Sequence, residues 1–296
     1  MKIETHAAQV QHRQDLQKVS PVGRIDTHVH FWKYNSKEFS WVRDPGIQTD
    51  FMPEDFQQAA RPGGYDGCIN VQARFTYEEN YFMLDLAGHH DFIKGVVGWV
   101  SLLDDRLDYR MQVLAQNPKL VGVRDFISDC LDADGRIRHE FAKGLKTVEA
   151  FEKVFELVIN ENQLSDAIVL AREFPGLNFV IDHMAKPKIK DKAIEPWATK
   201  MKEISKLKNV FCKVSGIATE ANPTCWAEED FKPYLDVVFT AFEPTRLMIG
   251  SDWPVCLGAG TYSHVMSIVE KYMTYCSDKE LEGIYGGNAM KLYGIP

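Results

Sequence analysis

The stretch VGRIDTHVHFW (residues 22–32) decides the fold of this chain, because it indicates a first β-strand at 24–29 that ends in two histidines. Successive side chains of a strand point to opposite faces, so His28 and His30 share one face, with Cα atoms about 6.6 Å apart. Both imidazoles could therefore meet at one point. Three interpretations follow: metal ligands, groups that face a substrate, or core histidines that fill space.

Seven further short β-branched or aromatic runs follow, separated by segments with helical periodicity. The expected strands are 24–29, 66–71, 93–100, 119–126, 155–159, 177–182, 209–215 and 246–250. This alternation predicts βαβ units and a parallel sheet, and eight of them in 296 residues fit one α/β (β/α)8 TIM barrel, for which about 250 residues is typical. We expect a single barrel domain over residues 22–296, preceded by a flexible N-terminal arm at 1–21.

Composition and charge exclude several classes of protein. The chain is 45% hydrophobic and 26% charged, typical of a soluble globular enzyme, and no apolar run approaches the length of about 18 residues that a membrane span needs. Its net charge is -8 and its lysines and arginines are scattered along the sequence, so we expect no basic surface that could bind nucleic acid. This charge pattern favours a small-molecule partner. The six cysteines lack CxxC pairs and no signal peptide precedes them, which favours a reducing, cytoplasmic location.

Polar residues follow most of the expected strands, at the end where barrel enzymes place their active sites. Neutral imidazole is a good ligand for zinc and similar ions, so His183 could add a third nitrogen to the two of the first strand, and Asp252 could complete the set. The polar strand ends are Asp26-Thr27-His28-Val29-His30, Gln72-Ala73-Arg74, Arg124-Asp125, Asp182-His183, Lys213-Val214-Ser215 and Ser251-Asp252-Trp253-Pro254.

Each candidate also has a plainer structural interpretation. Gly-Ser-Asp before Trp-Pro is good turn chemistry, so Asp252 could cap a helix. His183 could be a buried histidine satisfied by a neighbour such as Asp182. Arg124 could form a surface salt bridge, although its position directly after LVGV favours an inward contact with an anion. The aromatic residues Phe31, Trp32 and Trp41 could pack or could wall a pocket, and neither Ser215 nor Ser251 lies in a G-x-S-x-G nucleophile elbow.

Taken together and in order, the motifs resemble one family, the hydrolases of the amidohydrolase superfamily that open sugar lactones, which include L-fuconolactonase and L-rhamnonolactonase and are related to dicarboxypyrone lactonases. The resemblance extends over residues 25–293 and implies a distorted (β/α)8 barrel. The segments that carry it are IDTHVHFW (25–32), VQARFTYEEN (71–80), GVVGWVSL (95–102), VGVRDFI (121–127), FVIDHMAKP (179–187), KVSGIATEAN (213–222), RLMIGSDWPVC (246–256) and GGNAMKLYG (286–294).

The resemblance also implies roles for individual residues. His28, His30, His183 and Asp252 would form the catalytic floor, and Arg124 would contact the substrate carbonyl or a hydroxyl. Weaker pocket candidates are Gln72, Glu79, Trp253 and Trp32.

Two departures from the family pattern limit what is carried over. Binuclear relatives use a lysine on strand 4 and a histidine on strand 5, whereas this chain offers Arg124 there and ends strand 5 at Ile159-Asn160. We therefore expect one divalent metal ion, zinc if any, or none. Asp125 stands where many relatives carry histidine.

The resemblance implies hydrolysis of an L-fucono- or L-rhamnono-type lactone. We expect Asp252 to activate the water and then to protonate the leaving ring oxygen. The carbonyl oxygen would be polarised by a metal held on His28, His30 and possibly His183, or, in a metal-free site, by those imidazoles together with Arg124. The first alternative is a metal-dependent decarboxylase of an aromatic or unsaturated acid, and another is a non-catalytic sugar-acid binding protein. The identity of the sugar and the oligomeric state stay open.

Overall fold

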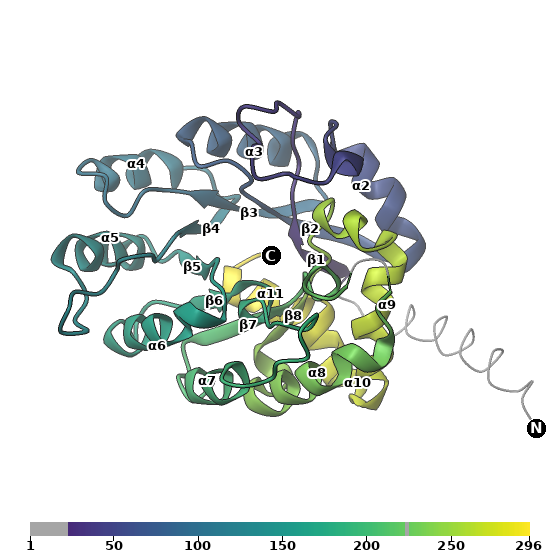
Figure 1. Cartoon of the computed structure of the whole chain (residues 1–296). Helices are drawn as coiled ribbons and strands as arrows, with labels where there is room; N and C mark the ends of the chain where they lie inside the picture. Colours follow the sequence, from purple (N-terminus) through teal and green to yellow (C-terminus); the bar gives the residue numbers. More distant parts are fainter. Residues whose placement is uncertain (1–22, 223–224) are drawn as a thin grey trace, which may run out of the picture.

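The eight expected strands are all present in a computed structural model, which describes residues 23–222 and 225–296; the expected arm at 1–21 lies outside the described residues. They form one parallel sheet in chain order from β1 to β8, and helices surround it (Figure 1), which confirms the (β/α)8 barrel. The strands are β1 (Arg24–Val29), β2 (Tyr65–Val71), β3 (Ile93–Trp99), β4 (Leu120–Asp125), β5 (Val154–Leu157), β6 (Phe179–Ile181), β7 (Val210–Val214) and β8 (Leu247–Ile249).

The helices bury one face against the outside of the sheet, as the βαβ pattern requires. None of those in the described part of the chain is both long and apolar enough to cross a membrane. Local capping fixes where some begin; for α3, the Thr76 side chain accepts a hydrogen bond from Glu79 N. The helices are α2 (Pro53–Ala60), α3 (Tyr77–His89), α4 (Leu107–Leu114), α5 (His139–Ala150), α6 (Leu164–Glu173), α7 (Trp197–Ile204), α8 (Glu228–Phe242), α9 (Tyr262–Tyr272), α10 (Asp278–Glu282) and α11 (Asn288–Tyr293).

An apolar layer closes the amino-terminal end of the barrel. The C-terminal helix α11 packs into this layer and lies within the ring of strands in Figure 1. Because side chains alternate along a strand, the inward positions that follow Val154 and Val180 lie two residues further on, and there the barrel becomes polar with Glu156 and Asp182. The layer comprises Ile25, Ile69, Val71, Val97, Val121, Val154, Val180, Met248, Ala289, Tyr293 and Ile295.

A β-bulge in β1 sets the direction of the two histidines. Asp26 pairs with Cys68 and Val29 with Asn70, so three residues of β1 advance against two of β2. The extra residue reverses the alternation, and both Ile25 and His28 face the barrel interior although they lie three positions apart.

The loop after β8 completes the closure of the barrel against β1. Asp252 N donates to the carbonyl of His28 at 2.9 Å, and His30 N donates to the carbonyl of Trp253 at 2.8 Å. The buried Asp26 carboxylate strengthens this junction by accepting from Ser251 N at 2.9 Å. The first and last strand ends are thereby fixed beside each other.

Candidate active site

Three histidine side chains converge on one carboxylate oxygen at the carboxyl end of the barrel. Oδ1 of Asp252 lies 3.2 Å from Nε2 of His30 and 3.9 Å from Nε2 of both His28 and His183. All four side chains are buried. The site thus joins residues from β1 and from the loops after β6 and β8, as the sequence predicted for barrel strand ends.

Contacts at the other ring nitrogens orient the two β1 imidazoles. His30 Nδ1 lies 2.7 Å from the carbonyl oxygen of Val71; since a carbonyl only accepts, Nδ1 carries the proton and Nε2 presents a lone pair. His28 Nδ1 lies 3.3 Å from Oδ1 of Asp182 and 3.4 Å from Nζ of Lys213, and its buried Nε2 has no hydrogen-bond partner in the described residues. Both Nε2 atoms thus face the site.

A strained turn places His183. Residues 183–186, none of them glycine, all have a positive φ, between 49° and 57°. Such left-handed backbone costs roughly 1–2 kcal/mol per residue and concentrates at functional sites. The turn is held by contacts: Met184 and Ala185 are fully buried, Trp197 Nε1 donates to the carbonyl of Met184 at 2.7 Å, and Ser215 Oγ lies 2.9 Å from His183 Nδ1.

Gly216 gives the His183 ring its space. Its φ of +60° is in the left-handed region, and a Cβ at this position would lie 2.7 Å from Nδ1 of His183. Ser215, which the sequence offered as a polar strand end and excluded as a nucleophile, is therefore the hydrogen-bond partner of His183. Asp182 does not take this part, because it faces His28 and Arg124 instead.

The donor set of His28, His30 and Asp252 fits one divalent metal ion. Their ligand atoms all lie within 4.8 Å of one another. Zinc bonds of about 2.0–2.1 Å in a tetrahedron separate neighbouring ligand atoms by about 3.3 Å, close to the separations around Asp252 Oδ1. The unpartnered Nε2 of His28 supports the same assignment. His183 lies beside this group without belonging to it.

Burial and neighbouring groups set the charges of the site. Burial lowers the pKa of His28 and of His183 well below the usual histidine value, so both rings are neutral at pH 7. Burial alone would raise the pKa of Asp252, but His183, His30 and Lys186 together hold that pKa below its ordinary value. The site therefore presents an ionised Asp252 carboxylate beside the neutral imidazoles of His28 and His183.

A layer of fully buried charges supports the site from below. Lys213 Nζ lies 2.6 Å from Oε2 of Glu156 and 3.5 Å from Oδ1 of Asp182. Tyr293 of α11 donates a hydrogen bond to the same Glu156 carboxylate. Burial raises the pKa of Glu156 to about 7, whereas Lys213, His28 and Arg124 hold the pKa of Asp182 well below its usual value against the effect of burial.

Arg124 lies inside the barrel, as its position after LVGV predicted. Its Nη1 donates to Asp182 Oδ2 at 2.8 Å and its Nη2 to the carbonyl of Gln72 at 2.7 Å. Nε of Arg124 and both amide atoms of the Gln72 side chain are buried without a hydrogen-bond partner in the part of the chain that the structure describes. These atoms retain hydrogen-bonding capacity next to the site.

The other predicted pocket residues have partners elsewhere. Glu79 accepts from Ala73 N at 3.0 Å and from Arg74 Nε at 2.6 Å. Trp253 packs edge-on against Phe31, Phe51 and Phe56, and Trp32 donates to the carbonyl of Thr49. Asp125 accepts hydrogen bonds from Trp99 Nε1 and from the backbone of Leu102 and Phe126. None of these four residues lines the cavity above Asp252.

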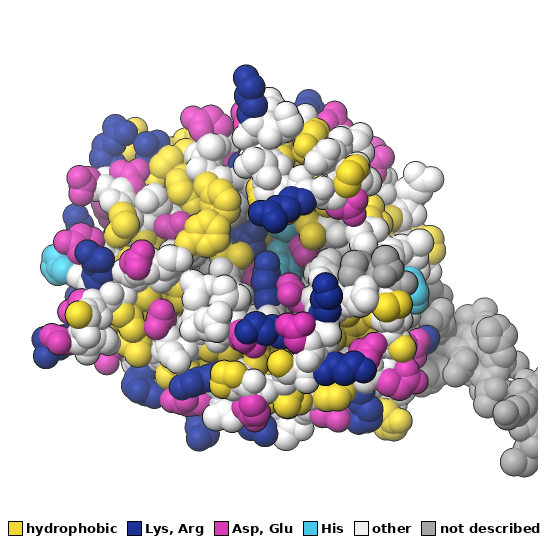
Figure 2. Space-filling view, viewed as in Figure 1, with side chains coloured by type: hydrophobic (Ala, Val, Ile, Leu, Met, Phe, Trp, Pro, Cys, Tyr) yellow, Lys and Arg dark blue, Asp and Glu magenta, His cyan; other side chains and the backbone are white. Residues whose placement is uncertain are grey.

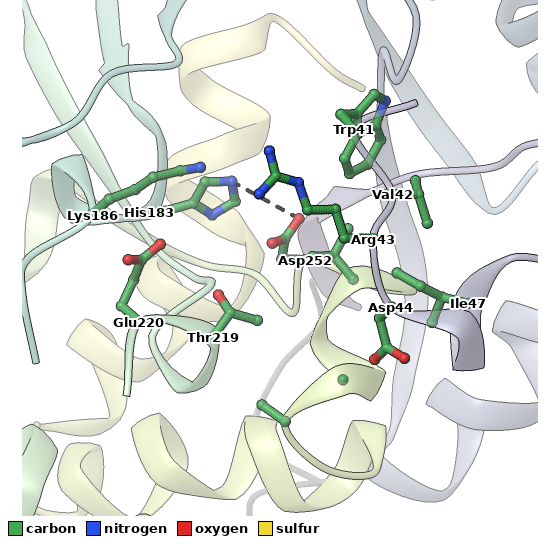
Figure 3. Close-up of a pocket in the computed structure, with 13 residues that line it drawn as sticks. Trp41, Val42, Arg43, Asp44, Ile47, His183, Lys186, Thr219, Glu220 and Asp252 are labelled. Carbon is green, nitrogen blue, oxygen red and sulfur yellow. Dashed lines mark ion pairs between the residues drawn. The ribbon is translucent and has the colours of Figure 1, made fainter. Parts of the chain in front are cut away.

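A cavity of about 340 Å³ opens above Asp252 and His183 (Figure 3). The loop after β1 supplies an apolar wall that includes Trp41, and the loops after β6 and β7 supply a polar wall. Figure 2 shows this face hollowed, with histidine at the bottom and basic and acidic side chains around it. The sequence predicted His183 and Asp252 at this site and offered Trp41 as a pocket wall. It gave no role to other lining residues, among them Arg43, Lys186, Thr219 and Glu220.

Fold and site together define a barrel hydrolase with a His-His-Asp centre suited to one divalent metal ion. The family model described as Amidohydrolase matches residues 25–295, and the chain belongs to this family. It is 32% identical over 289 residues to an L-fucono-1,5-lactonase of Burkholderia multivorans, covering 92% of this chain and 96% of that protein. A second L-fucono-1,5-lactonase, from Burkholderia ambifaria, is also 32% identical, with the same coverage.

A solved structure agrees with the fold at this level of identity. A crystal structure of an amidohydrolase from Burkholderia multivorans with bound zinc is 33% identical in sequence and has a TM-score of 0.85. The match covers 92% of this chain and 99% of that chain. The similarity therefore extends over the whole barrel and not over single motifs.

Proposed function

We propose that this protein hydrolyses a sugar-derived lactone of the L-fucono-1,5-lactone type to the open sugar acid. The observation that carries the proposal is the ionised Asp252 carboxylate beneath an open cavity, with its Oδ1 facing three imidazole Nε2 atoms. The 32% identity to two L-fucono-1,5-lactonases over most of the chain supports this substrate class.

Asp252 supplies the proton transfers of the reaction. Its carboxylate accepts a proton from the attacking water as the water oxygen bonds to the lactone carbonyl carbon. When the bond between that carbon and the ring oxygen breaks, the protonated Asp252 returns the proton to the ring oxygen. The pKa of Asp252, held below its ordinary value, keeps the resting carboxylate ionised and ready to act as the base.

Polarisation of the carbonyl is the second requirement. A divalent ion held by His28, His30 and Asp252 would act as a Lewis acid toward that oxygen, and we propose zinc as the ion. Arg124 contributes a buried cation whose Nε is free to donate to a substrate oxygen. The Val71 carbonyl and Asp182 keep the two imidazoles oriented throughout.

The test is acid release from a panel of 1,4- and 1,5-aldonolactones in weak buffer with a pH indicator, with and without prior chelation. We expect acid release above the spontaneous rate, fastest with the L-fucono lactone. Asp252→Asn should abolish turnover with an unchanged circular dichroism spectrum, while Asp236→Asn, on the surface, should retain it. If the wild-type protein releases no acid above the spontaneous rate from any lactone of the panel, with metal restored, the proposal is refuted. Near-normal turnover by Asp252→Asn refutes the role of that residue.

The decarboxylase alternative is less supported, because the curated relatives above 30% identity are lactonases. Carbon dioxide release from an aromatic or unsaturated acid, without acid release from any lactone, would favour it. If a sugar acid raises the melting temperature of this protein, and the protein turns over neither the lactones nor the aromatic or unsaturated acids, the non-catalytic binding protein is favoured.

A further inference from the structure

The left-handed turn at 183–186 brings a second side chain to the cavity besides His183. Lys186 N donates to the carbonyl of His183 at 2.9 Å, so the two residues lie one turn apart. Both line the cavity, while Met184 and Ala185 between them are fully buried. The strained backbone therefore directs His183 and Lys186 together toward the space above Asp252.

Arg43 reaches the same space from the opposite wall. Figure 3 shows the Arg43 guanidinium and the Lys186 ammonium extending toward His183 and Asp252 from different sides of the cavity. Within residues 23–222 and 225–296, neither cation has a carboxylate within the 4.0 Å of an ion pair. Lys188, two residues further on, differs, since it pairs with Glu161 at 2.5 Å.

The acidic side chains of the same lining are Asp44, Glu220 and Asp252, and none of them forms an ion pair with Arg43 or Lys186. The protons of the two cations are therefore available to an anion in the space between them. A sugar lactone is neutral, so the substrate itself brings no charge to that space. Negative charge appears on the carbonyl oxygen as water adds, and the acid formed after ring opening loses its proton to water at neutral pH and becomes a carboxylate. The cations are thus matched to the transition state and to the product.

We propose that Lys186 is a catalytic residue whose ammonium contacts the reacting ester and binds the negative charge that forms as the lactone opens, with Arg43 contributing from the opposite wall. This inference rests on the proposed function. No proton has to leave Lys186 in this role; the water proton and the ring-oxygen proton both pass through Asp252, as above.

Loss of the Lys186 charge should affect kcat and KM differently. An interaction made in the transition state but not with the neutral substrate changes kcat and leaves KM nearly unchanged. A hydrogen bond to a charged group corresponds to about a 10- to 100-fold effect. Lys186→Met should therefore lower kcat on the L-fucono lactone by about 10- to 100-fold with KM within about threefold. Lys186→Arg should recover part of the loss, because it restores the charge.

Product binding provides a readout independent of turnover. We expect calorimetry to show that wild-type protein binds L-fuconate more tightly than the neutral alditol L-fucitol, and that Lys186→Met and Arg43→Met each weaken L-fuconate binding by about tenfold without changing the L-fucitol affinity. The matched control is Lys190→Met, which removes an exposed lysine from the same segment outside the cavity and should behave as wild type.

The outcomes separate the two proposals. If Lys186→Met keeps the wild-type kcat and L-fuconate affinity, or if wild-type protein does not distinguish L-fuconate from L-fucitol, the role of Lys186 is refuted whether or not lactones are hydrolysed. If wild-type protein hydrolyses no lactone yet binds L-fuconate in a manner that depends on Lys186, the anion site stands and the lactonase proposal falls. Arg43→Met, in an exposed loop position, keeps the binding test valid if Lys186→Met does not fold.

Discussion

Replacement of Lys213 by methionine tests whether the buried charge layer below the site depends on this one ammonium. Methionine keeps most of the side-chain length and removes the charge. Glu156 and Asp182 would then lie fully buried with Arg124 as the nearest remaining cation, paired to Asp182 at 2.8 Å. Removing one partner of a buried ion pair costs about 3–5 kcal/mol, since the other charge is left without compensation.

The cost should depend on pH because Glu156 can take up a proton. Its pKa is about 7 in the folded wild-type protein, above the value of the unfolded chain, so the wild type has lost this part of its stability once the pH exceeds about 7. Without Lys213 that pKa rises further, and the variant continues to lose stability above pH 7, by at most about 1.4 kcal/mol per pH unit. We expect a deficit of about 3–5 kcal/mol at pH 8.5 and a smaller one at pH 7.

Urea unfolding followed by circular dichroism at pH 7 and pH 8.5 measures this deficit. Lys232→Met is the control, because it removes a lysine that pairs with Asp236 on the surface and should cost less than about 0.5 kcal/mol. The double variant Lys213→Met/Glu156→Gln should regain at least about 2 kcal/mol, since the uncompensated carboxylate is gone. A Lys213→Met protein within about 1 kcal/mol of wild type at pH 8.5 would refute the reasoning.

Three further predictions follow from the site. Gly216→Ala should reduce lactone turnover by at least about tenfold, because the new Cβ displaces the His183 ring. The control is Gly135→Ala, which should leave turnover unchanged, because Gly135 has a similar φ of +75° but open space around it. Equal turnover in both variants would contradict the steric argument. Burial raises the pKa of Asp125, so the folded wild type binds a proton at this carboxyl more tightly than the unfolded chain does. The stability of the wild type should therefore fall relative to that of Asp125→Asn as the pH rises above about 4. Parallel stability curves of the two proteins between pH 4 and 7 would show that the pKa is not raised. Zinc at 100 times its dissociation constant should stabilise the wild-type protein by about 2.7 kcal/mol, seen as a higher melting temperature, and an equal shift in His30→Ala would remove that residue from the proposed ligand set.

The strands and the centre of the site were predictable because both depend on local pattern. Apolar runs separated by helical segments fix the order of a parallel barrel, and the barrel fixes which strand ends meet. His28, His30, His183 and Asp252 are among the polar strand ends that this rule selects, the resemblance singled them out, and the three imidazoles meet around one oxygen of Asp252.

The rest of the site depends on dihedral angles and on contacts between distant segments. The left-handed turn that directs Lys186 contains no glycine, so composition gives no sign of it. Glu79 was a reasonable pocket candidate from the motif, but helix α3 carries it to Arg74. Lys213 was visible as a polar strand end, yet its partner Glu156 lies in a strand without an apparent polar end.

Helix α11 gives the last part of the chain a role in assembling the site. Tyr293 contacts Glu156 across 137 positions of sequence, and it belongs to the apolar layer that contains Ile69 and Met248. Synthesis from the amino terminus therefore delivers all eight strands before it delivers the residues that shield the open end of the barrel from water. A chain stopped at residue 287 would carry every catalytic side chain and still lack Tyr293, the hydrogen-bond partner of the buried Glu156 carboxylate. Completion of the charged floor would accordingly wait for the synthesis of α11.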